Sequence, residues 1–401
     1  MRVVSKAAAT VLGTVLGTVL GLGLFAASPA PALAAASGVY ADRIVVGQSA
    51  PLNGTVAELG MAMREGLLAA FKEANDAGGI QGRKIEMLTR DDAYRADRAL
   101  ANAEELILTE GVFAMIGSVG TAPSMAAMQL ANDMGIPFIA PFTGAPALRQ
   151  PDLDYVINIR ASYDQEAEAW IERLTADLDT KRIAILYQDD AFGISGVMAV
   201  RKAMEKRGLS LVAEGSYYRN TTAVKTALLS LRKADPEAVL IVGAYRPAAE
   251  FIKLARSLGM DPRFLTSSFV GGEVFSQALA AQRTGVIVTH VMPLPQDETL
   301  PLVQQYQAAL KAMSDKARPD TVSLEGYVAG RLFLEVLRNI EGEPTQRAFI
   351  DTLYKVGSFD LGGFTLSFGK GDNQGSDAVT VTVIQDDGMP QQVENLPGAG
   401  G

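Results

Sequence analysis

The sequence predicts an α/β protein built from two doubly wound units, each a mostly parallel sheet with helices on both faces. Three observations lead to this prediction. Apolar, strand-like runs alternate with runs of helical periodicity, and the same rhythm starts again after Arg160. The strand-like runs are continuously apolar, which is typical of strands covered on both faces. The chain of 401 residues, 48% hydrophobic, is long enough for two to three compact units.

The first unit is predicted from the segments that follow residue 43. In one helical segment Leu67, Leu68 and Phe71 recur at helical spacing, and Gly78 ends the pattern. The expected strands are 43–47, 84–88, 114–117 and 137–140, and the expected helices are 61–77, 96–110 and 124–134.

The second unit repeats this order. Its expected strands are 182–187, 211–215, 238–243, 262–266 and 285–291, and its expected helices are 165–178, 196–208, 223–234 and 247–259. Two longer helices, 300–313 and 324–338, follow, and the tail segments 364–368 and 378–385 are expected to form an antiparallel pair. Open sheets of this kind bind ligands outside the carboxyl ends of their strands. Two facing units therefore predict a ligand cleft that closes by a hinge motion.

Composition excludes several classes of function. The net charge of -9 opposes binding to nucleic-acid phosphates. The absence of cysteine excludes disulfides, thiol nucleophiles, cysteine-ligated metals and a lipid-anchored cysteine at the start of the mature chain. With His290 as the single histidine, a zinc site or a serine-type triad is not expected. We predict no metal, no cofactor and no catalytic residue, and we expect His290 to be a structural residue near the hinge.

The N-terminus has the pattern of an export signal. Arg2 and Lys6 precede an uncharged apolar run over 7–27, and residues 32–34 (Ala-Leu-Ala) match a small-residue cleavage site. We predict a signal peptide over 1–34, cleaved near Ala34, and a mature periplasmic protein. An uncleaved anchor is the alternative, because the run approaches the roughly 18–20 residues that span a bilayer.

Longer segments resemble a known family. The opening IVVGQSAPLNGTVAELGMAMREGLLAAFKEANDAGGIQGRKIEMLTRDD resembles the type I periplasmic solute-binding proteins, in the leucine/isoleucine/valine-binding branch that feeds ABC importers. FAMIGSVGTAPSMAA, GIPFIAPFTGAPALR, RIAILYQDDAFGISG, AVLIVGAYRPAAEFIKLARSLGMDPRFLTSSF and SLEGYVAGRLFLEVL extend the resemblance over nearly the whole chain after the signal. It implies a soluble, non-enzymatic receptor that delivers a solute to a membrane permease. A periplasmic sensing module without a transport role is the alternative.

The resemblance also implies two Rossmann-like lobes joined by a three-crossover hinge, the type I periplasmic binding protein fold. We expect crossovers near Arg160, Gly285 and Gly357. The predicted division is lobe 1 over 43–160 and 286–356, lobe 2 over 161–285 and 357–395, and a flexible tail over 396–401.

In lobe 1 the resemblance assigns ligand contacts to two loops. Ser118 matches the serine whose hydroxyl holds a ligand carboxylate. Phe142, Thr143 and Gly144 match the loop that offers backbone groups and a hydroxyl, although here the polar residue comes one position earlier than in the family pattern. Ordinary hydrogen bonding within the loop is the alternative role for Ser118 and Thr143.

In lobe 2, Phe192 and Tyr245 match aromatic residues that line the cleft, with a place in the packed core as the alternative. Ser268 stands where amino-acid binders carry the acid that pairs with the ligand ammonium, and an unpaired ammonium in a closed cleft is costly. Either another acid substitutes, or the ligand has no α-ammonium group. The acids considered as substitutes are Asp164, Glu166, Asp189 and Asp190, whose alternative role is solvated or helix-capping charge.

The ligand class follows from these positions. Leu59 stands where relatives often carry an aromatic side chain, and Phe269 adds a ring beside Ser268. Together with Phe142, Phe192 and Tyr245, Phe269 is expected to flank a flat or apolar ligand. We expect a small-molecule ligand, namely a branched-chain or aromatic amino acid, a carboxylate or an amide.

Overall fold

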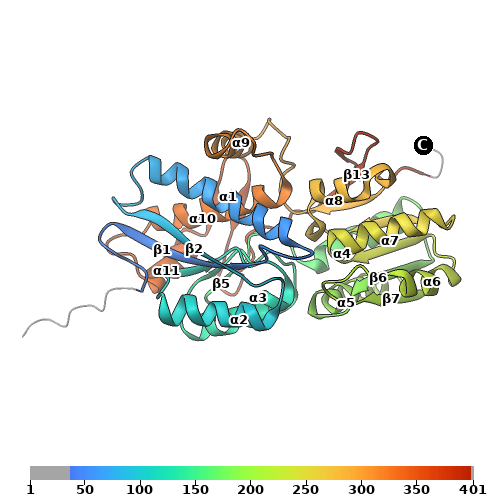
Figure 1. Ribbon diagram of the computed structural model, residues 1–401, viewed down its shortest axis with the longest axis horizontal. Helices are drawn as coiled ribbons and strands as arrows, with labels where there is room; N and C mark the ends of the chain where they lie inside the picture. Colours follow the sequence, from blue (N-terminus) through green and yellow to red (C-terminus); the bar gives the residue numbers. More distant parts are fainter. Residues whose placement is uncertain (1–36, 399–401) are drawn as a thin grey trace, which may run out of the picture. The chain divides into compact units, whose positions relative to one another are not determined.

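The computed structural model describes residues 37–398. The chain forms two α/β units, each with helices on both faces of a mainly parallel sheet, and this confirms the predicted fold class (Figure 1). The predicted signal peptide over 1–34 lies outside the described residues. Within 37–398, no helix combines the length and the apolar character that crossing a bilayer requires.

Lobe 1 is the unit built on a five-stranded parallel sheet with the order β2-β1-β3-β4-β5. Its strands are β1 (Arg43–Ala50), β2 (Lys84–Asp91), β3 (Ala114–Ile116), β4 (Phe138–Ile139) and β5 (Val156–Ile157). Its helices are α1 (Ala57–Asp76), α2 (Ala96–Glu104), α3 (Thr121–Asp133), α9 (Pro301–Met313), α10 (Thr321–Arg338) and α11 (Gln346–Val356). Because β1→β2 and β2→β3 run in opposite directions along the sheet, right-handed crossovers place α1 and α2 on opposite faces.

Lobe 2 is the unit built on a seven-stranded sheet with the order β14-β13-β10-β9-β8-β6-β7. Its strands are β6 (Ile183–Gln188), β7 (Ala213–Tyr217), β8 (Ala238–Val242), β9 (Arg263–Thr266), β10 (Ile287–His290), β13 (Thr380–Ile384) and β14 (Pro390–Gln392). Its helices are α4 (Tyr163–Ala176), α5 (Ala191–Glu205), α6 (Lys225–Lys233), α7 (Tyr245–Ser257) and α8 (Gly272–Leu279). Every residue of β8 is buried, as expected of a strand covered on both faces.

The expected pairing of the two tail segments is wrong. The segment expected at 364–368 becomes β12 (Thr365–Ser367), which pairs with β11 (Ser358–Asp360) in a separate hairpin. The segment expected at 378–385 becomes β13, which pairs antiparallel with β10 and β14. Alternating polarity predicted both strands correctly, but it does not determine which neighbouring strand each of them pairs with.

Two predicted crossovers also differ from the observed sheets. The strand β10 pairs with β9 and β13, so residues 287–290 belong to the sheet of lobe 2. The strand rhythm places this strand in the second unit, whereas the division implied by the resemblance places 286–356 in lobe 1. Residues 373–375 bond back to Asn158 beside β5, so the chain returns to lobe 2 after this point rather than near Gly357. Pairing with β9 and β13 on either side buries all four residues of β10, so the strand belongs to lobe 2.

The predicted tail over 396–401 is not free at its start. Leu396 is buried, and its backbone N–H donates to Asp177 Oδ2 at 2.8 Å. Arg263 Nη2 donates to the carbonyl of Pro397 at 2.8 Å. Residues 396 and 397 are therefore packed against lobe 2, and 399–401 lie outside the described residues.

Two glycines allow α1 and α10 to pack closely, although these helices are far apart in the sequence (Figure 1). A Cβ at Gly66 would lie 1.9 Å from the carbonyl oxygen of Ser323, and one at Gly326 would lie 2.3 Å from that of Met63. Neither position has room for a methyl group, so the helix backbones pack against each other directly.

We expect Gly66→Ala to lower the free energy of unfolding by about 1–3 kcal/mol, because the added methyl group forces the two helices apart. Urea unfolding followed by circular dichroism measures this. Gly369→Ala is the matched control, because a Cβ there meets no heavy atom within 4 Å. Equal stability of the two variants would contradict the close contact between α1 and α10.

Candidate functional site

The residues predicted to touch a ligand lie at the carboxyl ends of strands, as an open parallel sheet requires. Ser118 follows β3, and the loop 142–144 follows β4. In lobe 2, Phe192 follows β6, Tyr245 begins the helix after β8, and Ser268 follows β9. The structure thus brings all seven predicted residues to the edges where the lobes meet, while their contact with a ligand remains a prediction.

Five aromatic rings from both lobes meet at these strand ends and form what we call the aromatic cluster: Tyr94, Phe142, Tyr163, Phe192 and Phe269. Phe269 is at the centre, with ring centroids 4.5 Å from Phe192, 5.3 Å from Phe142 and 6.3 Å from Tyr94. Tyr163 lies 5.3 Å from Phe192. All five side chains are buried, so the junction between the lobes is apolar at this point.

Tyr94 was not predicted. It follows β2, and its hydroxyl accepts a hydrogen bond from Gln188 Nε2 of lobe 2 at 3.2 Å. Its backbone φ of +60° is uncommon for a residue other than glycine, asparagine or aspartate, and the tight turn after Asp92 imposes it. An aromatic residue directly after a predicted strand was the signal that could have identified it.

The two predicted hydroxyls of lobe 1 differ in their partners. The Thr143 hydroxyl bonds to Thr121 Oγ1 at 2.7 Å and to the Tyr163 hydroxyl at 3.3 Å, both in other segments. It also accepts from the backbone N–H of Ala145 at 3.2 Å, which is the kind of bond within the loop given as its alternative role. Ser118 Oγ is buried and has no hydrogen-bond partner in the described part of the chain. At Gly144, a Cβ would lie 2.7 Å from the backbone nitrogen of Tyr163, so this loop needs a glycine to approach α4.

Glu166 of α4, one of the four acids considered as substitutes, lies beside Ser268. Glu166 Oε1 accepts from Ser268 Oγ at 2.9 Å, and Oε2 accepts from the Ser268 backbone N–H at 2.8 Å. The Thr289 hydroxyl donates to Oε2 at 2.5 Å. Glu166 is fully buried, and its carboxylate is held by three neutral donors of lobe 2.

The other three candidate acids have different roles. Asp164 is paired with Lys202 at 2.5 Å on the surface, and Asp189 is exposed. Asp190 caps α5 by accepting from the backbone N–H groups of Phe192 and Gly193. Burial raises the pKa of Asp190 above its ordinary value, against the lowering effect of its hydrogen bonds.

Arg160 is the main charged residue that sequence reasoning missed as a site residue. Its side chain is fully buried, Nη2 donates to Ser268 Oγ, and its guanidinium carbon lies 4.5 Å from the ring centroid of Phe142. Nη1 lies 3.6 Å from Glu325 Oε1, beyond hydrogen-bond distance, and Nη2 lies 3.9 Å from Glu166 Oε1. Its Nε and Nη1 find no hydrogen-bond acceptor among residues 37–398.

Glu325, from α10, was also missed. Burial raises its pKa to about 7, although the positive charge of Arg160 acts in the opposite direction. With Ser268 and His290, Glu325 lines a small cavity of about 10 Å³, room for a single water molecule. Arg160, Glu166 and Glu325 form what we call the hinge charge cluster, because they link the first crossover, α4 and α10.

His290 lies at the end of β10, buried against the small cavity. Its Nε2 is 3.0 Å from the Thr382 hydroxyl, and burial lowers its pKa to about 4. The imidazole is therefore neutral at pH 7. Its contacts fit the structural role that the sequence predicted.

Polar contacts at the rim join the two lobes. The Tyr245 hydroxyl donates to Glu58 of α1, and Arg246 Nη2 bonds to Glu58 Oε1 at 2.5 Å. Leu59 is buried next to this contact, where it packs against Gly271 of lobe 2 rather than standing as an exposed wall. Tyr245 thus bridges the lobes through its hydroxyl.

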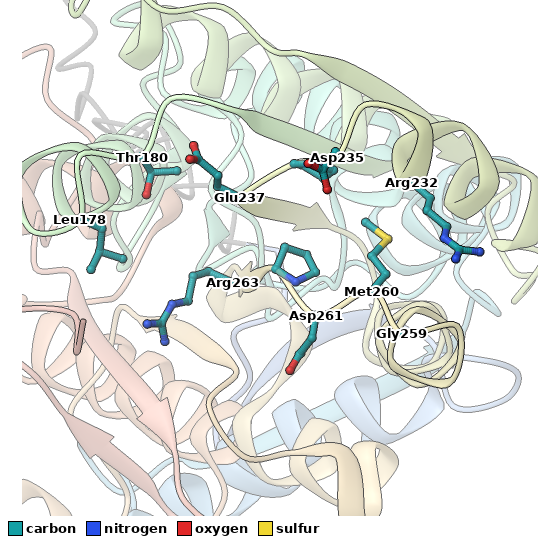
Figure 2. A pocket seen from close by; sticks show the side chains of 11 residues that line it. Leu178, Thr180, Arg232, Asp235, Glu237, Gly259, Met260, Asp261 and Arg263 are labelled. Atoms are coloured by element: carbon teal, nitrogen blue, oxygen red, sulfur yellow. The ribbon is translucent and has the colours of Figure 1, made fainter. Parts of the chain in front are cut away.

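A broad hollow of about 630 Å³ lies elsewhere on lobe 2 (Figure 2). Its side chains, among them Thr180, Glu237 and Arg263, come from segments that precede or begin β6, β8 and β9. These are the amino ends of the strands, opposite the edge where open sheets bind ligands. We therefore place the candidate site at the aromatic cluster and not in this hollow.

The pKa of Glu325 predicts a pH-dependent stability. The folded protein keeps the Glu325 proton in a range where the unfolded chain has lost it, so this stabilisation is full below about pH 4.5 and is lost as pH rises through about 7. Relative to Glu325→Gln, the wild-type free energy of unfolding should fall by about 2–3 kcal/mol between pH 5 and pH 8. Urea unfolding at both pH values measures this, with Glu335→Gln on the same helix as control. Parallel pH profiles of wild type and Glu325→Gln would rule out the raised pKa.

Comparison with known proteins gives the wider context. A family model described as periplasmic binding protein matches residues 43–389. The Leu/Ile/Val-binding protein homolog 7 of Brucella melitensis is 27% identical over 338 residues, which cover 80% of this chain and 82% of the relative.

Solved structures of similar proteins also belong to solute-binding proteins. A possible leucine/isoleucine/valine-binding protein from Rhodopirellula baltica is 34% identical with a TM-score of 0.84, covering 88% of this chain and 96% of that chain. A solute-binding protein from R. palustris in complex with benzoate shares the fold, with 19% identity, a TM-score of 0.78 and coverage of 88% and 95%. The similarity is to solute-binding proteins, so the chain is not an enzyme. The chain belongs to the periplasmic binding protein family, to which the leucine/isoleucine/valine-binding proteins are related.

Proposed function

We propose that this protein is the extracytoplasmic solute-binding component of an ABC-type importer. It captures a small amino acid, carboxylate or amide between its lobes and delivers it to a membrane permease. The observation that carries the proposal is the convergence of strand ends from both lobes on the aromatic cluster. Beside the cluster lie the Ser118 hydroxyl and two guanidinium nitrogens of Arg160, Nε and Nη1, which have no hydrogen-bond partner within residues 37–398. The similarity to solute-binding proteins and the predicted signal peptide over 1–34 support an extracytoplasmic role.

Binding works through closure of the lobes. Away from the crossovers, the hydrogen bonds between the lobes at the rim join Tyr245 and Arg246 to Glu58, and Thr55 to Asn220 at 3.0 Å. Polar rim contacts of this kind contribute little net energy in water. The rim can therefore open without a large cost, and a ligand that contacts both lobes shifts the equilibrium toward closure.

The aromatic cluster provides the apolar part of the site. In this structure its five rings fill the junction, so a ligand enters when the lobes separate and the rings of Phe142 and Phe269 move apart. The apolar or aromatic body of the ligand then replaces contacts between the rings. The benzoate bound by the R. palustris protein makes aromatic acids a reasonable first set of probes.

We expect a thermal-shift screen of amino acids, aromatic and branched carboxylates and their amides to reveal a ligand without turnover. At a hundredfold excess over Kd, binding stabilises the folded state by about 2.7 kcal/mol. Ser118→Ala should weaken that ligand about tenfold, because a buried hydroxyl that bonds a charged group contributes on the order of 1.5 kcal/mol. Ser257→Ala, on the exposed end of α7, is the control. A screen in which no solute raises the melting temperature would reject the proposed function.

We expect Glu58→Gln to raise Kd about three- to tenfold, because it weakens the rim contact with Arg246 and Tyr245 and lowers the closed population. Stopped-flow measurement should assign most of the change to faster dissociation. Glu86→Gln removes another exposed ion pair, with Arg43, far from the rim, and should leave Kd unchanged. The same Kd for Glu58→Gln and wild type would show that this contact plays no part in closure.

A further inference from the structure

We propose that the ligand is a small carboxylate that lacks an α-ammonium group, and that the guanidinium of Arg160 is its receptor. This inference rests on the proposed function and names the chemical class of the solute.

The two arginines beside the site differ in how their N–H groups are used. Arg149 donates through Nε to Gln374, through Nη1 to the carbonyl of Ala145, and through Nη2 to the carbonyls of Thr143 and Arg160. The N–H groups of the Arg149 guanidinium are therefore used to hold the 143–145 loop against the first crossover. Arg160 donates one hydrogen bond, to Ser268, and its Nε and Nη1 have no acceptor in the described chain. A buried guanidinium in this state fits a bidentate acid.

The acid nearest to Ser268 is already engaged. Glu166 accepts three hydrogen bonds, from the backbone and hydroxyl of Ser268 and from the hydroxyl of Thr289. Glu166 lies next to the position where an amino-acid binder is expected to carry an acid, but its oxygens bond to donors of the protein. These donors occupy three of the roughly four acceptor positions of a carboxylate. An ammonium group at the remaining position would lie beside the Arg160 cation, whose Nη2 is 3.9 Å from Oε1, and like charges repel strongly where water is excluded.

Glu325 is the remaining acid, and its position disfavours an ammonium group. Its Oε1 faces Arg160 Nη1 at 3.6 Å, so a cation bound to it would lie close to a second, buried cation. Repulsion between like charges is strong where water is excluded. Because burial raises the pKa of Glu325 to about 7, a large part of it is protonated at neutral pH and offers an O–H donor to an anion.

Phe142 connects the charged end of the site to its apolar end. Its ring lies under the Arg160 guanidinium, and its backbone N–H donates to the carbonyl of Ser118 at 2.7 Å. Phe142 therefore contacts both the guanidinium of Arg160, whose Nε and Nη1 have no acceptor in the described chain, and the segment that carries the Ser118 hydroxyl. A carboxylate at Arg160 would place its apolar body against the aromatic cluster.

The test compares ligands that differ in the ammonium group alone. Isothermal titration at pH 7 would measure leucine against 4-methylpentanoate, and phenylalanine against 3-phenylpropanoate, with 3-phenylpropanamide as the neutral analogue. The proteins would be wild type, Arg160→Lys, and Arg207→Lys as a matched change on the surface pair with Glu168. Arg160→Lys keeps the positive charge but loses the planar fork, which limits the risk of misfolding.

We expect the desamino acids to bind wild type at least tenfold more tightly than the amino acids. Arg160→Lys should weaken the preferred carboxylate about 30-fold, equivalent to about 2 kcal/mol, and change the neutral amide by less than threefold. Arg207→Lys should match wild type. Without ligand, Arg160→Lys should melt near the temperature of wild type. This result would show that the weaker binding comes from lost recognition of the carboxylate and not from an unstable hinge.

Three outcomes overturn the inference. Tighter binding of leucine or phenylalanine, abolished by Glu325→Gln, would assign an ammonium site to Glu325 and leave the proposed function standing. Equal loss of carboxylate and amide in Arg160→Lys would make Arg160 a structural residue of the hinge. Failure of the carboxylates to bind, with another solute found in the wider screen, would reject the carboxylate class alone, whereas failure of every solute would also reject the proposed function.

Discussion

Arg160 places a positive charge, with no exposed surface, at the point where the chain first passes from lobe 1 to lobe 2. A buried charge is costly unless partners surround it, and the nearby structure supplies them. Glu166 comes from lobe 2, Glu325 from a helix of lobe 1, and Phe142 presents its ring to the guanidinium. The hinge charge cluster therefore connects the two lobes, because each of its acids approaches Arg160 from a different segment.

The cluster also explains how the site tolerates a serine at 268. Ser268 Oγ accepts from Arg160 and donates to Glu166, so it is an uncharged bridge between a cation and an anion. An acid at 268 would stand next to Glu166, and two carboxylates so close would repel each other. Ser268 and Glu166 thus form one arrangement, in which a helix carries the negative charge and the strand end carries a neutral hydroxyl.

The fold and the loops around the site could be predicted because both depend on local patterns. Apolar periodicity marked the strands, and a parallel sheet brings their carboxyl ends to one edge. The resemblance to the solute-binding family pointed to Ser118, Phe192 and Tyr245, and the structure places all three after the ends of strands. Arg160 and Glu325 could not be found this way, since 165 positions separate them and only tertiary packing makes either of them buried. The rhythm of strands and helices placed β10 in the second unit, but the lobe boundary taken from the resemblance fell before it, and only strand pairing shows where the boundary lies. The hydroxyl of Thr143 was a reasonable candidate, but Thr121 and Tyr163, which occupy it, lie in other segments.

The close contact between α1 and α10 has a consequence for the order in which the chain acquires structure. The helix α1 is made early, yet the helix that covers it is made about 250 residues later. The elements of lobe 2 from α4 to β10 are contiguous in the chain and complete in between. On a ribosome, lobe 2 has most of its partners before lobe 1 does, and the apolar face of α1 has to remain uncovered until α10 follows. A chain of this topology therefore leaves its N-terminal lobe incomplete until most of its sequence has been made.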